Sequence, residues 1–219
     1  MARFTRSAAL AAVALAAVAP AAAAHKGNPD FRSDTRGLSP ATRGVEVQVV
    51  NHDDSLELTN RSGRTVVVTG YRGEPYLRIG PSGSVAVNRR SPSHYLNDDR
   101  YAEGVEVPAA ADPKAAPDWQ EVDRTGRYTW HDHRIHWMAR TVPPQVKDES
   151  ERTKVFDWKV PVEVDGRPAA VSGSLIWVGR SGGGFPVAAG ISLAAAVLAG
   201  ALLVVVVRRR RGGPAKEAW

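Results

Sequence analysis

An apolar run near the C-terminus constrains this chain more than any other feature. Residues 185–207 form a stretch of 23 residues without a charged side chain, and four consecutive arginines, Arg208 to Arg211, follow directly. A helix rises about 1.5 Å per residue, so this length matches a hydrocarbon core about 30 Å thick. Arginines clustered after an apolar run are typical of the cytoplasmic end of a membrane span. The sequence therefore predicts a transmembrane helix over 185–207 and a basic cytoplasmic tail over 208–219.

The first 24 residues have the three parts of a secretory signal peptide. Arg3 and Arg6 precede an alanine-rich apolar stretch, which ends in small residues at Ala24. Cleavage after Ala24 makes His25 the first residue of the mature chain, whereas an uncleaved signal would give a protein with two spans. Signal and span together predict a single-pass type I protein of the cell membrane, with its folded domain outside the cytoplasm.

The charge distribution argues against a nucleic-acid partner. The formal net charge is +6, but residues 25–185 carry equal numbers of acidic and basic side chains. The excess positive charge lies in the signal and in the tail, where it reports topology. The chain has no cysteine, which excludes thiol catalysis, thiolate metal sites and disulfides. A metal here would bind nitrogen, oxygen or thioether ligands.

Short alternating segments rich in β-branched residues predict an all-β domain. Gly, Asn, Asp and Pro separate these segments, and no helical period extends over eleven residues in the exported part. We expect an extended lead-in over 25–44, one β-sandwich of immunoglobulin-like or cupredoxin-like type over 45–179, and a glycine-rich linker over 180–184. The predicted strands are 45–49, 56–58, 66–68, 76–79, 85–87, 105–107, 119–122, 127–138, 154–164 and 169–178. The polar loop over 88–104 and the passage over 109–118 are predicted to be irregular.

A histidine-rich stretch, Trp130 to Met138, is the densest chemical motif. In a strand His131 and His133 project to the same face about 6 to 7 Å apart, so they can converge on one metal ion. Imidazoles suit zinc, copper or nickel, and Asp132 can supply oxygen or orient a ring. His136 has the opposite strand parity and joins the site only if a turn or bulge intervenes near Arg134.

A structural role for the same residues is the alternative. Histidines flanked by Trp, Arg and Asp can form a hydrogen-bonded and stacked corner at a sheet edge without any ligand. The acidic turns at 51–54 and 97–99 are predicted to use Asx side chains in hairpin turns, because neither has the order of a calcium loop. No enzyme motif is present, so we expect a binding domain and not an enzyme.

The mature N-terminus carries a resemblance to a known family. An exported β-sandwich that begins with His25 and continues into Ser39-Pro40-Ala41 resembles the CopC-type copper-carrier and copper-resistance domains. The resemblance implies copper(II) bound by His25, by Asp132 and by His131 or His133. This chain is longer, orders these residues differently and has no methionine-rich copper(I) site. The whole chain also resembles uncharacterised single-span surface proteins of high-GC bacteria.

These features lead to one expectation and one alternative. The expected function is a membrane-anchored binding domain for copper(II) or another divalent metal such as zinc, with the ligands drawn from His131, His133, His136, Asp132 and His25. The alternative is a ligand-free interaction or scaffold module that serves a neighbouring membrane protein.

Overall fold

The computed structural model describes residues 27–180 together with 195, 198, 202, 205 and 206. The predicted signal, His25, nearly all of the predicted span and the tail lie outside the described residues, and they stay predictions. Among the residues that are described, no helix has the length and apolar character needed to cross a membrane.

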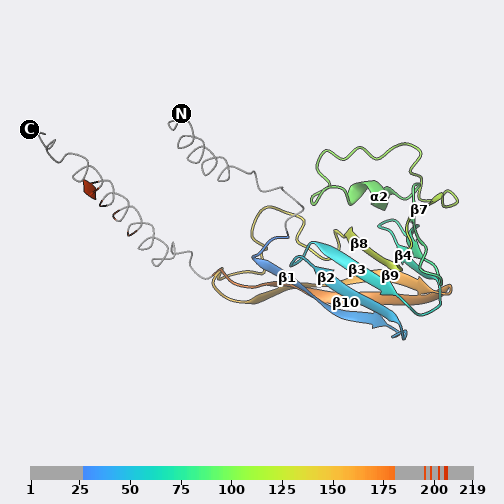
Figure 1. The fold of residues 1–219 in the computed structure, drawn as a ribbon, viewed down its shortest axis with the longest axis horizontal. Coiled ribbons are helices and arrows are strands. Elements are labelled where there is room, and N and C mark those ends of the chain that lie inside the picture. Colours follow the sequence, from blue (N-terminus) through green and yellow to red (C-terminus); the bar gives the residue numbers. More distant parts are fainter. Residues whose placement is uncertain (1–26, 181–194, 196–197, 199–201, 203–204, 207–219) are drawn as a thin grey trace, which may run out of the picture. The chain divides into compact units, whose positions relative to one another are not determined.

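The described part of the chain is an all-β fold with one short helix (Figure 1). Its elements in order are β1 Phe31–Ser39, β2 Val45–Val50, β3 Ser55–Asn60, β4 Val66–Thr69, β5 Pro75–Ile79, β6 Val85–Asn88, α2 Pro92–Leu96, β7 Trp119–Asp123, β8 Arg127–His131, β9 Thr153–Val164 and β10 Arg167–Trp177.

The strands form two antiparallel sheets, consistent with the predicted β-sandwich. The larger sheet has the order β1-β10-β9-β4-β5-β6-β7, and the smaller sheet has the order β2-β3-β8. Strand β3 pairs with β8 in a register that places Ser55 opposite His131. This pairing matters for the site, because it brings the residues just before β3 to the end of β8.

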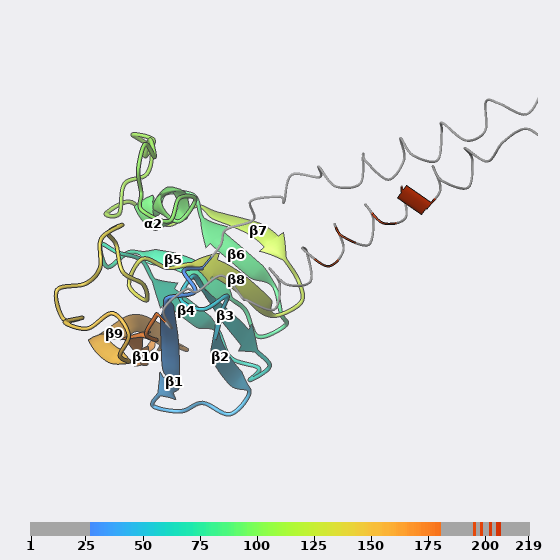
Figure 2. The same cartoon turned by 90° about the vertical axis from the view of Figure 1, so that its left-hand side faces the viewer.

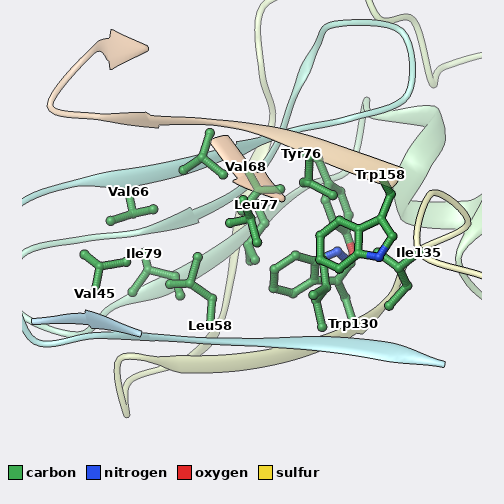
Figure 3. Close-up of a cluster of buried hydrophobic side chains, with 14 of the residues drawn as sticks. Val45, Leu58, Val66, Val68, Tyr76, Leu77, Ile79, Trp130, Ile135 and Trp158 are labelled. Carbon is green, nitrogen blue, oxygen red and sulfur yellow. The ribbon is translucent and has the colours of Figure 1, made fainter. Parts of the chain in front are cut away.

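One hydrophobic core lies between the sheets. It is rich in Val and Leu along most of its length, whereas Tyr76, Trp130, Ile135 and Trp158 occupy one region of it (Figure 3). Trp130 is 4% exposed and Ile135 is completely buried. Trp130 directly precedes His131 and Ile135 directly precedes His136, so the core anchors the backbone of the histidine-rich stretch at two points.

The N-terminal boundary of the sandwich differs from the prediction. Residues 31–39 belong to the segment expected to be an extended lead-in, but they form edge strand β1, which pairs with β10. The register of this pairing shifts between Thr35 and Gly37, so the side chains on either side of the shift do not follow one alternation. A bulged edge strand shows no period of two in sequence, which explains the omission.

The predicted strand over 105–107 is also wrong. This segment is irregular in the structure, and the side chain of Val107 is 38% exposed. The alternating Val-Glu-Val pattern has no neighbouring strand to pair with. A run of three residues does not form a strand without such a partner.

Helix α2 and the long connection from β6 to β7 lie on one side of the strands in both orthogonal views (Figure 1, Figure 2). Buried Glu74, in the turn between β4 and β5, accepts hydrogen bonds from the hydroxyls of Ser91 and Ser93. Gly70 permits this contact, because a Cβ there would lie 2.1 Å from the Glu74 carboxylate. The turn thus holds the start of α2 in place, and with it the loop after α2, which contacts His133 through Asp99.

Candidate metal centre

The end of strand β8 explains why three histidines meet. The prediction extended this strand to Met138, but it ends at His131. Oδ1 of Asp132 accepts a hydrogen bond of 3.1 Å from the backbone N–H of Arg134, an Asx-type turn that replaces strand pairing. The chain turns at 133–134, which is the condition under which His136 was expected to join His131 and His133.

The three imidazoles form a compact cluster. One nitrogen from each of His131, His133 and His136 lies within 4.8 Å of the others. The Nε2 atoms of His131 and His136 are 3.0 Å apart. Two imidazole nitrogens bound to one tetrahedral zinc ion at about 2.0–2.1 Å are about 3.3 Å apart. The pair His131 and His136 therefore has nearly the spacing that a metal requires, and His133 lies within 4.8 Å of both.

Each imidazole has an acceptor at its other nitrogen. Nδ1 of His136 donates to the carbonyl of Trp137 at 3.1 Å, and Nε2 of His133 donates to the carbonyl of Asp99 at 2.8 Å. Nδ1 of His131 is 3.2 Å from Oδ1 of Asp54, within ion-pair distance but without the alignment of a hydrogen bond. Metal-binding histidines in proteins have this arrangement, with an outer N–H directed at a carboxylate or a backbone carbonyl.

The acceptors determine which nitrogens carry lone pairs. Because a carbonyl only accepts, His136 must be protonated at Nδ1, and its Nε2 presents a lone pair to His131. Asp54 favours a proton on Nδ1 of His131, which leaves a second lone pair on the facing Nε2. Two lone pairs 3.0 Å apart repel unless a cation, either a proton or a metal ion, lies between them.

Asp54 belongs to a buried charged network beside the cluster. Arg100 contacts Asp53 at 2.7 Å and Asp54 at 3.1 Å. Burial opposes ionisation of Asp54, but its contacts with His131 and Ser55 and the charge of Arg100 hold its pKa at about 2. Burial raises the pKa of Asp53, against the charge and hydrogen bond of Arg100 and a hydrogen bond from Asn28. The carboxylates outnumber the guanidinium, which favours a cation nearby.

The histidine pKa values suit metal binding, which requires neutral imidazole. Burial lowers the pKa of His133. Burial, helped by the positive charge of Arg100, lowers the pKa of His136 to about 3. Both rings are therefore neutral at pH 7 and have nitrogen lone pairs available without losing a proton.

The structure places Asp132 outside the cluster. This side chain is fully buried, and Oδ1 accepts from Nε of Arg134 at 2.8 Å while Oδ2 accepts from Nη2 of Arg134 at 2.7 Å and from the indole of Trp130 at 2.9 Å. With the backbone N–H of Arg134, four donors occupy its lone pairs. Asp132 therefore shapes the turn, and it is not among the side chains that converge in the cluster.

Tyr71 supports His133 from the turn between β4 and β5. Its ring stacks on the imidazole with centroids 5.3 Å apart, and its hydroxyl accepts the backbone N–H of His133 at 2.9 Å. The same hydroxyl donates to Asn97. The guanidinium of Arg134 also lies over the Tyr71 ring, 5.0 Å from its centre. His133 is thus held by a different element from the one that holds His131.

His25, the remaining predicted ligand, lies outside the described residues. Asn28, three residues further along the chain, donates its backbone N–H to Oδ1 of Asp53 at 2.9 Å. The first described residues are thus bonded to the network that surrounds Asp54.

A shallow hollow of about 290 Å³ adjoins the cluster. His133, His136, Trp137, Met138, Ala139 and Phe156 line it, and the side chain of Met138 is 42% exposed. Because two of the three imidazoles reach this hollow, a bound metal would be approached from this side.

Two residues that position the imidazoles were not predicted as part of the site. Asp54 and Asp99 lie in the acidic turns that were interpreted as simple hairpin turns. Asp54 precedes β3, and only the β3–β8 register brings it next to His131. Asp99 acts through its backbone carbonyl, which leaves no signal in a sequence.

Comparisons of the chain with protein-family models, with curated proteins and with solved structures found no match.

Proposed function

We propose that this protein is a metal-binding domain that holds one divalent transition metal through His131, His133 and His136. Asp54, the carbonyl of Asp99 and the carbonyl of Trp137 orient the three rings. The wider setting, a cell-surface domain with a sandwich of immunoglobulin-like or cupredoxin-like type next to a membrane span, is part of this proposal.

One observation carries the proposal: Nε2 of His131 and Nε2 of His136 face each other at 3.0 Å while both rings have an acceptor at the opposite nitrogen. Burying two inward lone pairs at that distance costs free energy. A metal ion removes this cost, because it accepts both lone pairs and strengthens the hydrogen bond of His136 to the Trp137 carbonyl and the ion pair of His131 with Asp54.

The donor set favours copper(II) or zinc. Imidazole suits both ions, and copper(II) binds nitrogen sites more tightly than its first-row neighbours. Three imidazoles leave at least one coordination position, which His25 would fill if the CopC-type resemblance extends to the metal site. Water or a partner's side chain would fill the position otherwise.

A titration of the purified full-length protein with copper(II) and zinc tests this proposal. Calorimetry should show one tight site, and the double variant His131→Ala/His136→Ala should lose it. His52→Asn is the matched control, because His52 is exposed and its positive φ of 65° suits asparagine. Equal binding by the wild type and the double variant, with both folded by circular dichroism, would show that the cluster does not bind metal.

The alternative is a ligand-free interaction or scaffold module with a structural histidine cluster. The observation that favours it is that a single proton can also bridge the two facing nitrogens. If the cluster is structural, the double variant should have the same metal content as the wild type. Its free energy of unfolding should be lower. Wild-type protein that shows no saturable binding tighter than about 1 mM would favour this alternative.

A further inference from the structure

A second and larger hollow lies on another side of His131. It has a volume of about 510 Å³ and is lined by residues before and in β3, in β5, in α2 and the loop that follows it, and in β8: Asp54, Ser55, Tyr76, His94, Asn97, Asp98, Tyr128, Thr129, Trp130 and His131. This volume lies within the range of small-molecule sites, about 300–1,000 Å³. It also suits a small molecule better than a protein partner.

Three polar side chains at this pocket have hydrogen-bonding atoms that remain available to a ligand, although the His94 ring also packs edge-on to Tyr95 with centroids 4.8 Å apart. Among the described residues, the imidazole of His94, the carboxylate of Asp98 and the hydroxyl of Tyr128 form no side-chain hydrogen bond or ion pair. They come from α2, from the loop after it and from β8. Polar groups from three separate elements that remain available in one hollow can contact a single ligand.

The charges at this pocket select the class of ligand. None of the lining residues is Lys or Arg, and two of them are carboxylates. Asp54 is already paired with Arg100, so Asp98 is the carboxylate that remains for a ligand. Burial lowers the pKa of His94, so its ring is neutral at pH 7 and does not repel a cation. An anion would find two carboxylates and no Lys or Arg side chain here.

The aromatic lining also favours a cation. Tyr76, Tyr128 and Trp130 are among the lining residues. Tyr76 and Trp130 are 3% and 4% exposed, so the ring of Tyr128 is the one most accessible to a ligand. The face of an aromatic ring attracts an ammonium group, and the attraction is stronger when water is excluded. A carboxylate together with aromatic rings is a suitable environment for an organic ammonium group.

We infer that this pocket binds a small organic cation whose ammonium group contacts Asp98 and the ring of Tyr128. His131 lines this pocket and also belongs to the histidine cluster, but the two residues assigned to the ammonium group, Asp98 and Tyr128, are not part of that cluster, so the inference does not require a bound metal. It concerns a second ligand site in the same domain.

A comparison of a charged and a neutral probe of the same shape tests the inference. The full-length protein is titrated with n-butylammonium and with n-butanol, and the chemical shifts of the pocket residues are followed by NMR. We expect saturable binding of n-butylammonium with a Kd of about 0.1–1 mM, and at least tenfold weaker binding of n-butanol. No saturation with n-butylammonium, or equal affinity for the two probes, would overturn the inference.

Variants at exposed positions identify the site. Asp98→Asn should weaken n-butylammonium binding at least tenfold and should leave n-butanol unaffected. Asp112→Asn is the matched control, because Asp112 is exposed, lies in the same long connection and does not line the pocket. Copper(II) affinity measured on the same samples should not change in Asp98→Asn, which separates failure of this inference from failure of the metal site. Equal n-butylammonium affinity in Asp98→Asn and Asp112→Asn would contradict the assignment.

Discussion

At the residue scale, Asp54 controls which nitrogen of His131 carries a proton. Its carboxylate is 3% exposed, lies 3.2 Å from Nδ1 and stays ionised because its pKa is about 2. A negative charge at this nitrogen keeps the proton there and leaves Nε2 as the nitrogen available to the proposed metal. It also makes the ring a stronger electron donor.

Replacement of Asp54 should therefore weaken metal binding without removing a ligand. We expect Asp54→Asn to lower metal affinity about 10- to 100-fold, as is found for residues that orient metal-binding histidines. Calorimetric titration measures this change. Asp34→Asn, at an exposed aspartate that pairs with Arg32 and Arg152, is the control and should leave affinity unchanged. An Asp54→Asn protein with wild-type affinity would remove Asp54 from the site.

Asp132 stabilises the turn after β8 through its ion pair with Arg134, so its replacement should change the free energy of unfolding. Its carboxylate is fully buried against Arg134, so Asp132→Asn leaves a largely buried guanidinium without its counter-ion. We expect the free energy of unfolding to fall by about 3–5 kcal/mol. Urea denaturation monitored by tryptophan fluorescence checks this value. A loss below about 1 kcal/mol would show that the ion pair does not stabilise the turn.

At the element scale, the end of β8 decided which histidines meet, and the sequence predicted this only in part. The Trp130 to Met138 stretch was predicted to supply the candidate ligands, and the structure brings its three histidines together, with a turn between His131 and His136 as the prediction required. The strand end was missed, because an Asx-type turn at Asp132 depends on how a side chain is used and not on hydrophobic pattern. Asp54 was missed because strand register is a property of two segments that are distant in sequence.

The loop after α2 should respond to metal binding. The carbonyl of Asp99 holds His133, Arg100 pairs with Asp54, and the ring of Tyr101 lies edge-on to His136 with centroids 6.4 Å apart. A metal that fixes the rings should also fix this loop. We expect amide hydrogen exchange over residues 97–101 to slow at least tenfold on addition of metal. The turn at 61–64, remote from the cluster in sequence and pairing, should not change. Equal rates over 97–101 with and without metal would contradict this coupling.

At the scale of the whole molecule, the buried histidines make stability depend on pH. A histidine whose pKa falls on folding binds protons more readily in the unfolded chain, so the free energy of unfolding decreases as pH drops below about 6.5. For His136 the decrease continues toward its folded pKa of about 3. His133 contributes in the same direction.

This dependence can be measured in the presence of a chelator. We expect His136 alone to lower the free energy of unfolding by about 2 kcal/mol between pH 7 and pH 5. Urea denaturation at the two pH values measures the loss, and His136→Gln should reduce it. If His136→Gln lost as much stability as the wild type, His136 would not be buried in its neutral form.

The all-β architecture followed from alternation of β-branched residues, which is a local signal. Strand β1 was not predictable, because it depends on pairing with β10, which is distant in sequence. The prediction at 105–107 failed for the same reason, since no strand lies beside that segment to pair with it. The same limit applied to the site, where the ligands were readable and the residues that position them were not.

X-ray absorption spectroscopy of the copper(II)- or zinc-loaded protein tests metal binding by the three histidines most directly. We predict first-shell nitrogen scattering at about 2.0 Å with the outer-shell pattern of at least three imidazoles, reduced by one imidazole in His133→Ala. A spectrum without imidazole scattering, or one that is the same in His131→Ala, His133→Ala and His136→Ala as in the wild type, would contradict the account.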